Sequence, residues 1–281
     1  MLKFTKMHGI GNDYVYINAF DQKIDDPNAL AKKLSDRRFS IGGDGVILIC
    51  PSDVADAKMR MFNADGSEGK MCGNGVRCVG KYVYDNILED KSRDTVSIET
   101  LSGIKNMKIT AFCGKAELLE VDMGKAELKT ELIPAVYEGS DTIIAKPLLV
   151  NGEEHIVTCV SLGNPHCVTF VFDVDSLELE KIGPYFEKHK AFPEQINTEF
   201  VKVIDSHTLQ MRVWERGSGE TWACGTGACA TVVAACENGY CKKGEDITVH
   251  LRGGDLIINY TDERVLMTGP ATKVFDGEIE V

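Results

Sequence analysis

Two cysteines of this 281-residue sequence each open the same short motif, Cys-Gly-x-Gly. The first copy is Cys72-Gly-Asn-Gly75 and the second is Cys224-Gly-Thr-Gly227. A run with helical character follows each copy, so each thiol is predicted to lie in the positive field of a helix N-terminus. That field lowers a thiol pKa from about 8.5 toward the reactive range. The glycines leave backbone N–H groups exposed, and these can bind an anion such as a carboxylate.

Two such turns that meet at one site are suited to inversion of a stereocentre by two bases. A ligand carboxylate would be held between the helix N-termini, with one sulfur on each side of its α-carbon. One thiolate removes the α-proton while the opposing thiol delivers a proton to the other face. The two sulfurs must therefore differ in protonation state, and they exchange roles with the direction of the reaction.

The two motifs belong to an internal duplication with an offset of 152 residues. Gly11-Asn12 aligns with Gly163-Asn164, and Met59-Arg60 aligns with Met211-Arg212. Glycine-rich bends match while the apolar residues between them drift, as expected for two halves that share a backbone but differ in core packing. Two copies are too few for a repeat array, so we expect two similar domains that face one another.

Local patterning predicts mixed α/β structure. Helices are expected after each motif and on the surface at 27–38 and 177–190. The second motif helix is small and apolar on every face, which predicts a buried central helix that ends at Asn238-Gly239. Short β-rich runs bounded by Gly, Asn and Asp predict strands at 14–18, 46–49, 58–62, 96–99, 117–121, 167–172, 200–203, 208–214 and 255–260.

Composition and charge exclude several classes of protein. Apolar residues make up 43% and charged residues 26% of the chain, which is ordinary for a globular protein. The net charge of −12 argues against a nucleic-acid or anionic-membrane surface. No apolar run reaches the length of a membrane helix, and the charged N-terminal segment argues against a signal peptide. We therefore expect a cytoplasmic protein with no nucleic-acid or membrane partner.

The ten cysteines fit reduced thiols better than a disulfide framework. The sequence contains no Cys-x-x-Cys, so neither a zinc site nor a thioredoxin-like site is expected. Cys78, Cys229 and Cys236 fall inside the predicted helices and are expected to be structural. With no phosphate loop, dinucleotide fingerprint or obvious pyridoxal-phosphate lysine, the chemistry is expected to need no cofactor and no metal.

The chain resembles the diaminopimelate epimerase family over essentially its whole length. The segments that carry the resemblance are His8-Gly-Ile-Gly-Asn-Asp13, Phe62-Asn-Ala-Asp-Gly-Ser67, Met71-Cys-Gly-Asn-Gly-Val-Arg77, Gly163-Asn-Pro-His166, Trp214-Glu-Arg-Gly217, Ala223-Cys-Gly-Thr-Gly227 and Gly269-Pro-Ala271. The resemblance implies an α/β (α+β) fold of two pseudo-symmetric domains, each a mixed sheet around a central helix, with the active site in the interdomain cleft. We place the domains at 1–123 with a returning strand at about 274–281, and at 124–273.

The activity that the resemblance implies is interconversion of LL- and meso-2,6-diaminopimelate, on the route to lysine and peptidoglycan precursors. The enzyme would be a pyridoxal-phosphate-independent isomerase, with a homodimer as the candidate assembly. Cys72 and Cys224 match the catalytic pair, and His166 and Glu215 match residues beside it. The matched substrate ligands are Asn12, Asn63, Gly73, Asn74, Asn164, Asn197, Glu215, Arg216, Gly225 and Thr226.

One position departs from the family pattern. Some relatives carry Gln in the loop Gly42-Gly-Asp-Gly45, where this chain has Gly45, so a side-chain contact is lost there. Asn197 lies one repeat length after Gly45, so the second domain supplies the polar side chain at this repeat position. No role is carried over to Gly45.

Structural explanations remain open for several of these residues. Either motif cysteine could be a buried thiol, Asn12 a turn residue and Arg216 a surface ion-pair partner. His166 could be a structural histidine, and Asn63 and Asn197 have no support beyond the family match.

Four other functions also remain open. A proline or hydroxyproline racemase would use the same two thiols but would not need Asn63, Asn197, Glu215 and Arg216, because proline has no second amino-acid head. A phenazine-type isomerase is disfavoured because both cysteines are present. A binding module for an anionic amino acid would use the helix N-termini alone, and a thiol redox protein lacks the expected motif.

Overall fold

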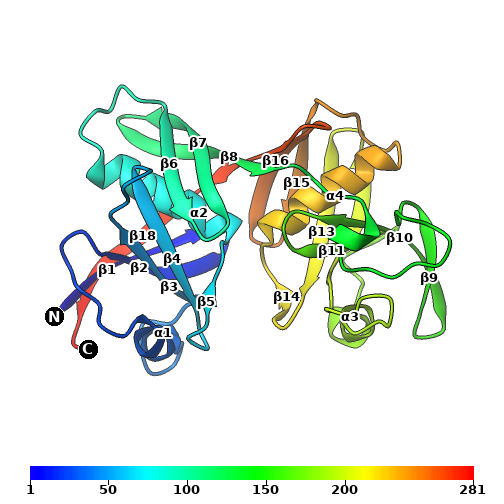
Figure 1. The fold of residues 1–281 in the computed structure, drawn as a ribbon, viewed down its shortest axis with the longest axis horizontal. Coiled ribbons are helices and arrows are strands. Elements are labelled where there is room, and N and C mark those ends of the chain that lie inside the picture. The colour runs from blue at the N-terminus through cyan, green and yellow to red at the C-terminus, as the bar shows by residue number, and fades with distance from the viewer. The chain divides into compact units, whose positions relative to one another are not determined.

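The computed structural model describes residues 1–281, which form two compact units. Unit 1 comprises Met1–Asp122 and Thr268–Val281, and unit 2 comprises Met123–Met267. Both are mixed α/β, as Figure 1 shows for each unit in turn. No helix has both the length and the apolar character needed to cross a membrane.

In unit 1, a mixed sheet packs on two helices. The first helical segment is α1 (Pro27–Ser35), and α2 (Gly73–Tyr82) continues into the turn η1 (Val83–Ile87). The strands are β1 (Leu2–Gly9), β2 (Asn12–Asn18), β3 (Gly45–Cys50), β4 (Ala57–Asn63), β5 (Glu68–Gly69), β6 (Thr95–Thr100), β7 (Gly103–Phe112), β8 (Lys115–Gly124) and β18 (Thr272–Ile279). β2 and β3 are parallel, as are β4 and β6, and the other pairs in this unit are antiparallel.

The central strands of unit 1 are buried on both faces because each face carries a helix. Val46 and Leu48 of β3 belong to the cluster around Leu30, Ala31 and Leu34 of α1. Ile47 points the other way, and its Cδ1 lies against Gly75 in the first turn of α2. Successive side chains of a strand alternate between faces, so an unbroken apolar run such as Gly45–Cys50 is typical of a strand covered on both sides.

Unit 2 repeats this arrangement. Its helices are α3 (Leu179–Glu187) and α4 (Gly225–Glu237), with the short turn η2 (Thr130–Leu132). Its strands are β9 (Lys146–Val150), β10 (Glu153–Ser161), β11 (Pro165–Phe170), β12 (Asn197–Asp205), β13 (Thr208–Glu215), β14 (Gly219–Thr221), β15 (Asp246–Leu251) and β16 (Gly254–Tyr260), and β17 (Val265–Pro270) follows. β11 and β12 are parallel, as are β13 and β15.

The element bounds reproduce the offset of 152 residues. α1 begins at Pro27 and α3 at Leu179, and α2 begins at Gly73 and α4 at Gly225. An ion pair is repeated as well: Arg60 Nε lies 2.8 Å from Glu68 Oε1, and Arg212 Nε lies 2.8 Å from Glu220 Oε1. The arginines of the two matched Met-Arg pairs therefore join β4 to β5 and β13 to β14.

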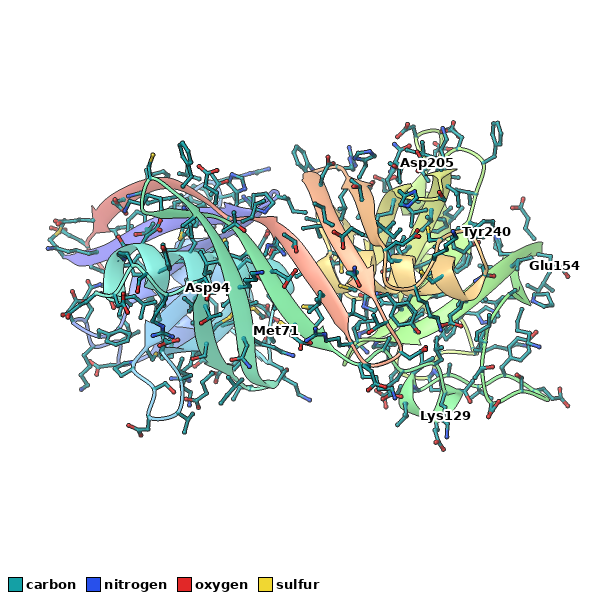
Figure 2. All side chains as sticks on the ribbon, turned by 90° about the horizontal axis from the view of Figure 1, so that it is seen from above. Met71, Asp94, Lys129, Glu154, Asp205 and Tyr240 are labelled. Carbon is teal, nitrogen blue, oxygen red and sulfur yellow. The ribbon has the colours of Figure 1, made fainter.

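The predicted buried helix is confirmed. Nearly every residue of α4 from Gly225 to Ala235 is buried, and strands β10 to β13, β15 and β16 surround it. Figure 2, seen from above, shows Tyr240 just beyond the C-terminal end of this helix. Asn238 is the C-cap and Gly239 adopts a positive φ of 77°, as the Asn-Gly signal predicted.

Both predicted surface helices are present but shorter than expected. The first ends at Ser35 because Asp36 is extended, with ψ at 115°, and accepts hydrogen bonds from the N–H groups of Arg38 and Phe39. The second begins at Leu179 and ends at Glu187. Every predicted strand is present, although Phe172 lies beyond the end of β11.

Candidate functional site

Cys72 and Cys224 are the N-cap residues of α2 and α4. Cys72 Sγ accepts a hydrogen bond from Gly75 N at 3.4 Å, and Cys224 Sγ accepts one from Gly227 N at 3.3 Å. Each thiol thus satisfies one of the N–H groups that a helix start leaves without an intrahelical partner. The duplication therefore places the two sulfurs identically in their own units, in contact with the glycine-rich turns predicted from the sequence.

Cys72 is joined to other predicted site residues through Asn12. The thiol donates to Asn12 Oδ1 at 3.2 Å, while Asn12 Nδ2 donates to Asp44 Oδ2 at 2.7 Å. Arg37 in turn holds Asp44, with Nη2 2.8 Å from Oδ1. Asp44 fixes which end of the Asn12 amide faces the sulfur. Asp44 lies in the glycine loop beside Gly45, but no motif of the sequence marked it as a site residue.

Cys224 has the corresponding partner in unit 2. Asn164, the repeat equivalent of Asn12, donates from Nδ2 to Thr226 Oγ1 at 3.2 Å. That hydroxyl lies 3.5 Å from Cys224 Sγ. The structure thus brings each repeat asparagine to the thiol motif of its own unit, which a role as turn residue alone would not require.

The environment of Cys224 corrects one expectation. Burial raises the pKa of the Cys224 thiol well above its usual range, and the charges of Glu215 and Glu199 raise it further. Hydrogen bonds from Thr226 and Gly227 lower the pKa but do not compensate. The predicted lowering of this pKa at the helix start is therefore wrong for Cys224, because the cost of burying a thiolate exceeds the benefit of the helix N-terminus.

His166 lies in the interior of unit 2 beside Glu199. The two side chains have no solvent exposure, and His166 Nδ1 lies 2.7 Å from Glu199 Oε1. Their remaining polar atoms, His166 Nε2 and Glu199 Oε2, are buried without a hydrogen-bond partner. Residue spacing did not reveal Glu199; the only available signal was its position two residues after Asn197 on the same face of a strand.

The remaining predicted ligands of unit 2 meet at the end of β13. Asn197 Nδ2 donates to Pro165 O at 2.8 Å, and Asn197 Oδ1 accepts from Arg216 N at 2.9 Å. The exposed Arg216 guanidinium donates to Glu194 O at 2.9 Å. Glu215 accepts a hydrogen bond from Thr221 Oγ1. Asn197 therefore fixes the backbone that carries Glu215 and Arg216.

Two asparagines of unit 1 have local partners. Asn63 donates to Ser67 Oγ at 3.0 Å in the turn between β4 and β5. Asn74 is buried, and its Oδ1 accepts from Nη2 of the buried Arg77 at 2.9 Å. The Asn74 side chain is thus engaged within the helix, which leaves its backbone N–H as the group predicted to bind a carboxylate.

Gly45 cannot carry a side chain in this backbone. A Cβ at Gly45 would stand 2.1 Å from Phe62 O and 2.9 Å from Tyr14 Cε1. The close approach of β3 to β4 therefore explains why this position is glycine. Of the three cysteines predicted to be structural, Cys78 and Cys229 are fully buried, and burial raises the Cys78 pKa to about 11, whereas Cys236 is only partly buried.

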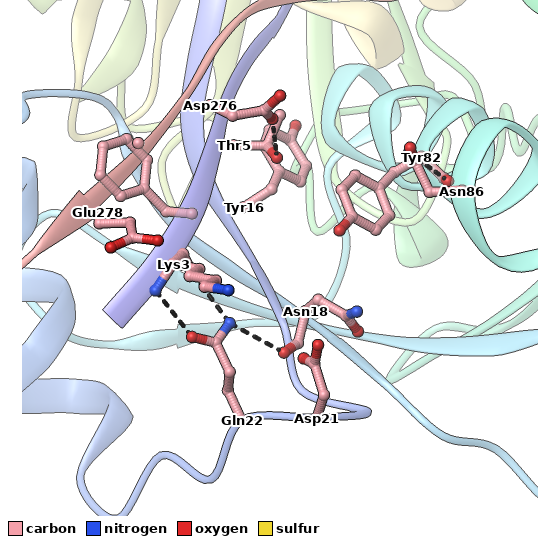
Figure 3. Close-up of a pocket in the computed structure, with 12 residues that line it drawn as sticks. Lys3, Thr5, Tyr16, Asn18, Asp21, Gln22, Tyr82, Asn86, Asp276 and Glu278 are labelled. Atoms are coloured by element: carbon pink, nitrogen blue, oxygen red, sulfur yellow. Dashed lines mark hydrogen bonds between the residues drawn. The ribbon is translucent and has the colours of Figure 1, made fainter. Parts of the chain in front are cut away.

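A pocket of unit 1 lies apart from the predicted site residues. It has a volume of about 480 Å³, and Figure 3 shows Gln22 bonded to Lys3 and Asn18 at its rim. Its lining includes no cysteine and none of the predicted ligands. The pocket therefore offers none of the chemistry of the thiol motifs.

Solved structures with the same fold define the class. A hydroxyproline epimerase from Agrobacterium vitis superposes with a TM-score of 0.73 at 13% identity, covering 98% of this chain and 91% of that chain. A phenazine biosynthesis protein of the PhzF family from Bacillus anthracis superposes with a TM-score of 0.71 at 16% identity, covering 100% of this chain and 99% of that chain. At this identity the likeness shows a shared fold, in agreement with the predicted α/β architecture.

Sequence comparison identifies the family within this class. The family model for diaminopimelate epimerase matches residues 4–129 and 158–274. Diaminopimelate epimerases from Methanococcus maripaludis and Acetivibrio thermocellus are each 55% identical over 282 residues, covering all of this chain and 100% and 99% of those proteins. One from Bacillus cereus is 51% identical, covering 99% of this chain and 96% of that protein. The chain belongs to the diaminopimelate epimerase family, and its members are isomerases.

Proposed function

We propose that the chain interconverts LL- and meso-2,6-diaminopimelate without a cofactor, with Cys72 and Cys224 as the two bases. The observation that carries this proposal is the identical placement of the two thiols as N-caps of glycine-started helices. Membership of the epimerase family supports the substrate and the reaction class. One thiol from each unit would then act on the same α-carbon of the substrate.

The proton balance of the reaction is simple. A thiolate on one side takes the α-proton and becomes a thiol, while the thiol on the other side gives its proton to the opposite face of the α-carbon and becomes a thiolate. The negative charge that develops on the α-carboxylate would be held by the N–H groups of Gly73, Asn74, Gly225 and Thr226. Oriented backbone donors at helix starts need little reorganisation as charge builds.

The non-reacting end of the substrate would be held mainly by unit 2. Arg216 and the amides of Asn63, Asn164 and Asn197 are proposed to bind the distal carboxylate, with Glu215 on the distal ammonium. Asn12, which now accepts from the Cys72 thiol, is proposed to exchange this bond for the substrate. That exchange would free Cys72 to act as a base when substrate is present.

The cellular context belongs to the same proposal. The reaction supplies lysine and peptidoglycan precursors, and we place the enzyme in the cytoplasm, with a homodimer as its assembly. We also propose that the two compact units, Met1–Asp122 with Thr268–Val281 and Met123–Met267, are the two domains of the duplication. The expected bounds are 1–123 with about 274–281 and 124–273, so the returning segment begins a few residues earlier than expected.

The proposal predicts that Cys72→Ala and Cys224→Ala each abolish epimerisation. Purified protein is incubated with LL-diaminopimelate in D2O, and the α-proton signal and stereochemistry are followed together. Wild type is expected to form the meso isomer with deuterium at the inverted centre. Cys50→Ala, a substitution of a half-buried cysteine outside both motifs, is the matched control and is expected to retain activity.

Retention of near-normal rates by either motif variant would contradict the two-base mechanism. Tight binding of diaminopimelate with no exchange or inversion by wild type would instead favour a binding module. Turnover of proline would favour a simple racemase.

A further inference from the structure

The two half-sites differ directly beneath the first turn of their helices. Gly75 of α2 and Gly227 of α4 are equivalent residues of the repeat. A Cβ at Gly75 would stand 2.8 Å from Cδ1 of Ile47, whereas a Cβ at Gly227 would stand 2.7 Å from Oε1 of Glu199. Ile47 and Glu199 are themselves one repeat apart, on β3 and β12. The same place thus holds a methyl group in unit 1 and a carboxylate in unit 2.

The difference extends to the neighbouring strand. Glu199 pairs with His166 of β11, and the repeat equivalent of His166 is Tyr14 of β2. Unit 2 therefore buries an ionisable pair where unit 1 has an isoleucine and a tyrosine. Such a pair is costly in a protein interior, and each buried atom left without a partner adds to the cost. Buried ionisable groups of this kind mark candidate functional positions.

The carboxylate lies close to the thiol of Cys224. The point at which a Gly227 Cβ would stand is 2.7 Å from Glu199 Oε1 and 3.2 Å from Cys224 Sγ, so the two atoms lie within about 6 Å of one another. Besides burial, the groups that face this thiol are the carboxylates of Glu215 on β13 and Glu199 on β12, the Thr226 hydroxyl and the Gly227 N–H. A nearby carboxylate disfavours a thiolate, because like charges repel in a poorly hydrated site.

We propose that Glu199, paired with His166, makes the two thiols unequal by favouring the protonated thiol at Cys224. Cys224 then enters as the proton donor in the direction of reaction that protonates the α-carbon from its side, and the reverse direction requires the two thiols to exchange protonation states first. The inference rests on the proposed two-base reaction, which requires one thiol and one thiolate. Glu199 is a positioning residue, since it acts on the reaction through Cys224. When Cys224 has given up its proton, the same carboxylate favours its return before the next cycle.

The test measures the ionisation of each thiol without substrate. Wild type and Glu199→Gln are alkylated with iodoacetamide across a pH series, and modification of the Cys72 and Cys224 peptides is followed by mass spectrometry. The pH at which alkylation of Cys224 is half-maximal, its midpoint, is expected to fall by about one pH unit in Glu199→Gln. Cys224 should then react about tenfold faster at neutral pH. Cys72 is the internal reference, and its midpoint is expected to stay in place.

Two variants separate charge from packing. Glu199→Asp keeps the carboxylate and is expected to keep the wild-type midpoint. Glu237→Gln alters another carboxylate of unit 2, one at the C-terminal end of α4 that accepts from Tyr260 Oη, and is expected to leave Cys224 unchanged. An unmoved Cys224 midpoint in Glu199→Gln would overturn the proposal. So would an equal shift in Glu199→Asp or Glu237→Gln.

A further variant keeps the proposal testable if Glu199→Gln does not fold. His166→Gln removes the imidazole but leaves the Glu199 carboxylate, so the Cys224 midpoint is expected to stay or rise, and a fall would overturn the inference. Alkylation needs no turnover. Failure of the epimerase proposal would therefore show in the D2O experiment and not in these midpoints.

Discussion

The proposed site residues are held in place by hydrogen bonds from residues on other elements. Asp44 orients the Asn12 amide, which accepts from Cys72, and Asn197 holds the Arg216 backbone in unit 2. Glu187 accepts from Gly217 N at 2.9 Å and so supports the same turn. At the residue scale, the proposed ligands are therefore set in place before substrate binds, which lowers the cost of ordering them in the complex.

Arg216→Met tests the proposed binding of the distal carboxylate by the Arg216 guanidinium. In the complex, loss of the guanidinium would leave the distal carboxylate of the substrate without a charged partner, at a cost of a few kcal/mol. We expect kcat/KM for LL-diaminopimelate to fall by about a hundredfold, since about 1.4 kcal/mol is tenfold. Wild type is expected to reject lysine, which lacks the second carboxylate, and also the DD-isomer, whose distal groups point the wrong way.

Lys188→Met is the matched control for this prediction. It removes one positive charge at the exposed end of α3, and we expect unchanged kcat/KM. Comparable wild-type kcat/KM values for LL-diaminopimelate and lysine would count against a site that also binds the distal carboxylate of the substrate.

At the scale of single elements, α3 depends on a glycine for its close contact with β13. A Cβ at Gly183 would stand 2.3 Å from Cδ2 and 2.4 Å from Cγ of Trp214. The indole cannot easily move, because its Nε1 donates to Glu187 Oε2 at 2.7 Å and Glu187 also holds Gly217. The contact thus links the outer helix of unit 2 to the turn that carries Glu215 and Arg216.

Gly183→Ala is expected to destabilise the protein even though alanine favours helix. Overpacking typically costs about 1–3 kcal/mol, while the gain in helix propensity is about 1 kcal/mol. Urea unfolding should therefore show a lower midpoint than for wild type. Lys181→Ala, at an exposed position of the same helix, should change stability by no more than about 0.5 kcal/mol. Equal stability of Gly183→Ala and wild type would mean that the helix can shift away from the indole.

At the scale of the whole molecule, both units bury carboxylates beside arginines. Burial opposes ionisation of Asp13 and Glu220, but Arg37 and Lys6 lower the Asp13 pKa below its usual value, and Arg212 and Arg252 lower that of Glu220. Asp56 behaves in the same way, through Arg93 and Ser97. The folded state therefore binds protons at these carboxylates less readily than the unfolded chain does.

Acid is accordingly expected to unfold the protein. A carboxylate with a lowered folded pKa contributes stability above its unfolded pKa, near 4, and loses it as the pH falls through the folded pKa. We expect the free energy of unfolding to decline below about pH 4.5 as these carboxylates take up protons. Urea melts at pH 7, 5, 4 and 3 at constant ionic strength measure this. A constant free energy between pH 5 and 3 would show that these pairs do not stabilise the fold.

Much of the architecture could be predicted from local pattern. The repeated Cys-Gly-x-Gly motif predicted both helix starts, and the Asn-Gly pair predicted the end of α4. Strand positions followed from short β-rich runs between turn residues. These features depend on backbone propensities and on side-chain period, which act between residues that are close in the chain. The duplication became visible for the same reason, because its glycines recur at one offset.

The sequence by itself therefore determined the elements, the repeat and the pair of thiols. Only the tertiary structure decided what each thiol touches. The Glu199 side chain extends from β12 toward Gly227 and Cys224 at the start of α4, whereas Ile47 fills the equivalent place in unit 1. Burial then reverses the expected direction of the Cys224 pKa. These outcomes depend on which side chains from distant segments share a desolvated space, and no local pattern encodes that.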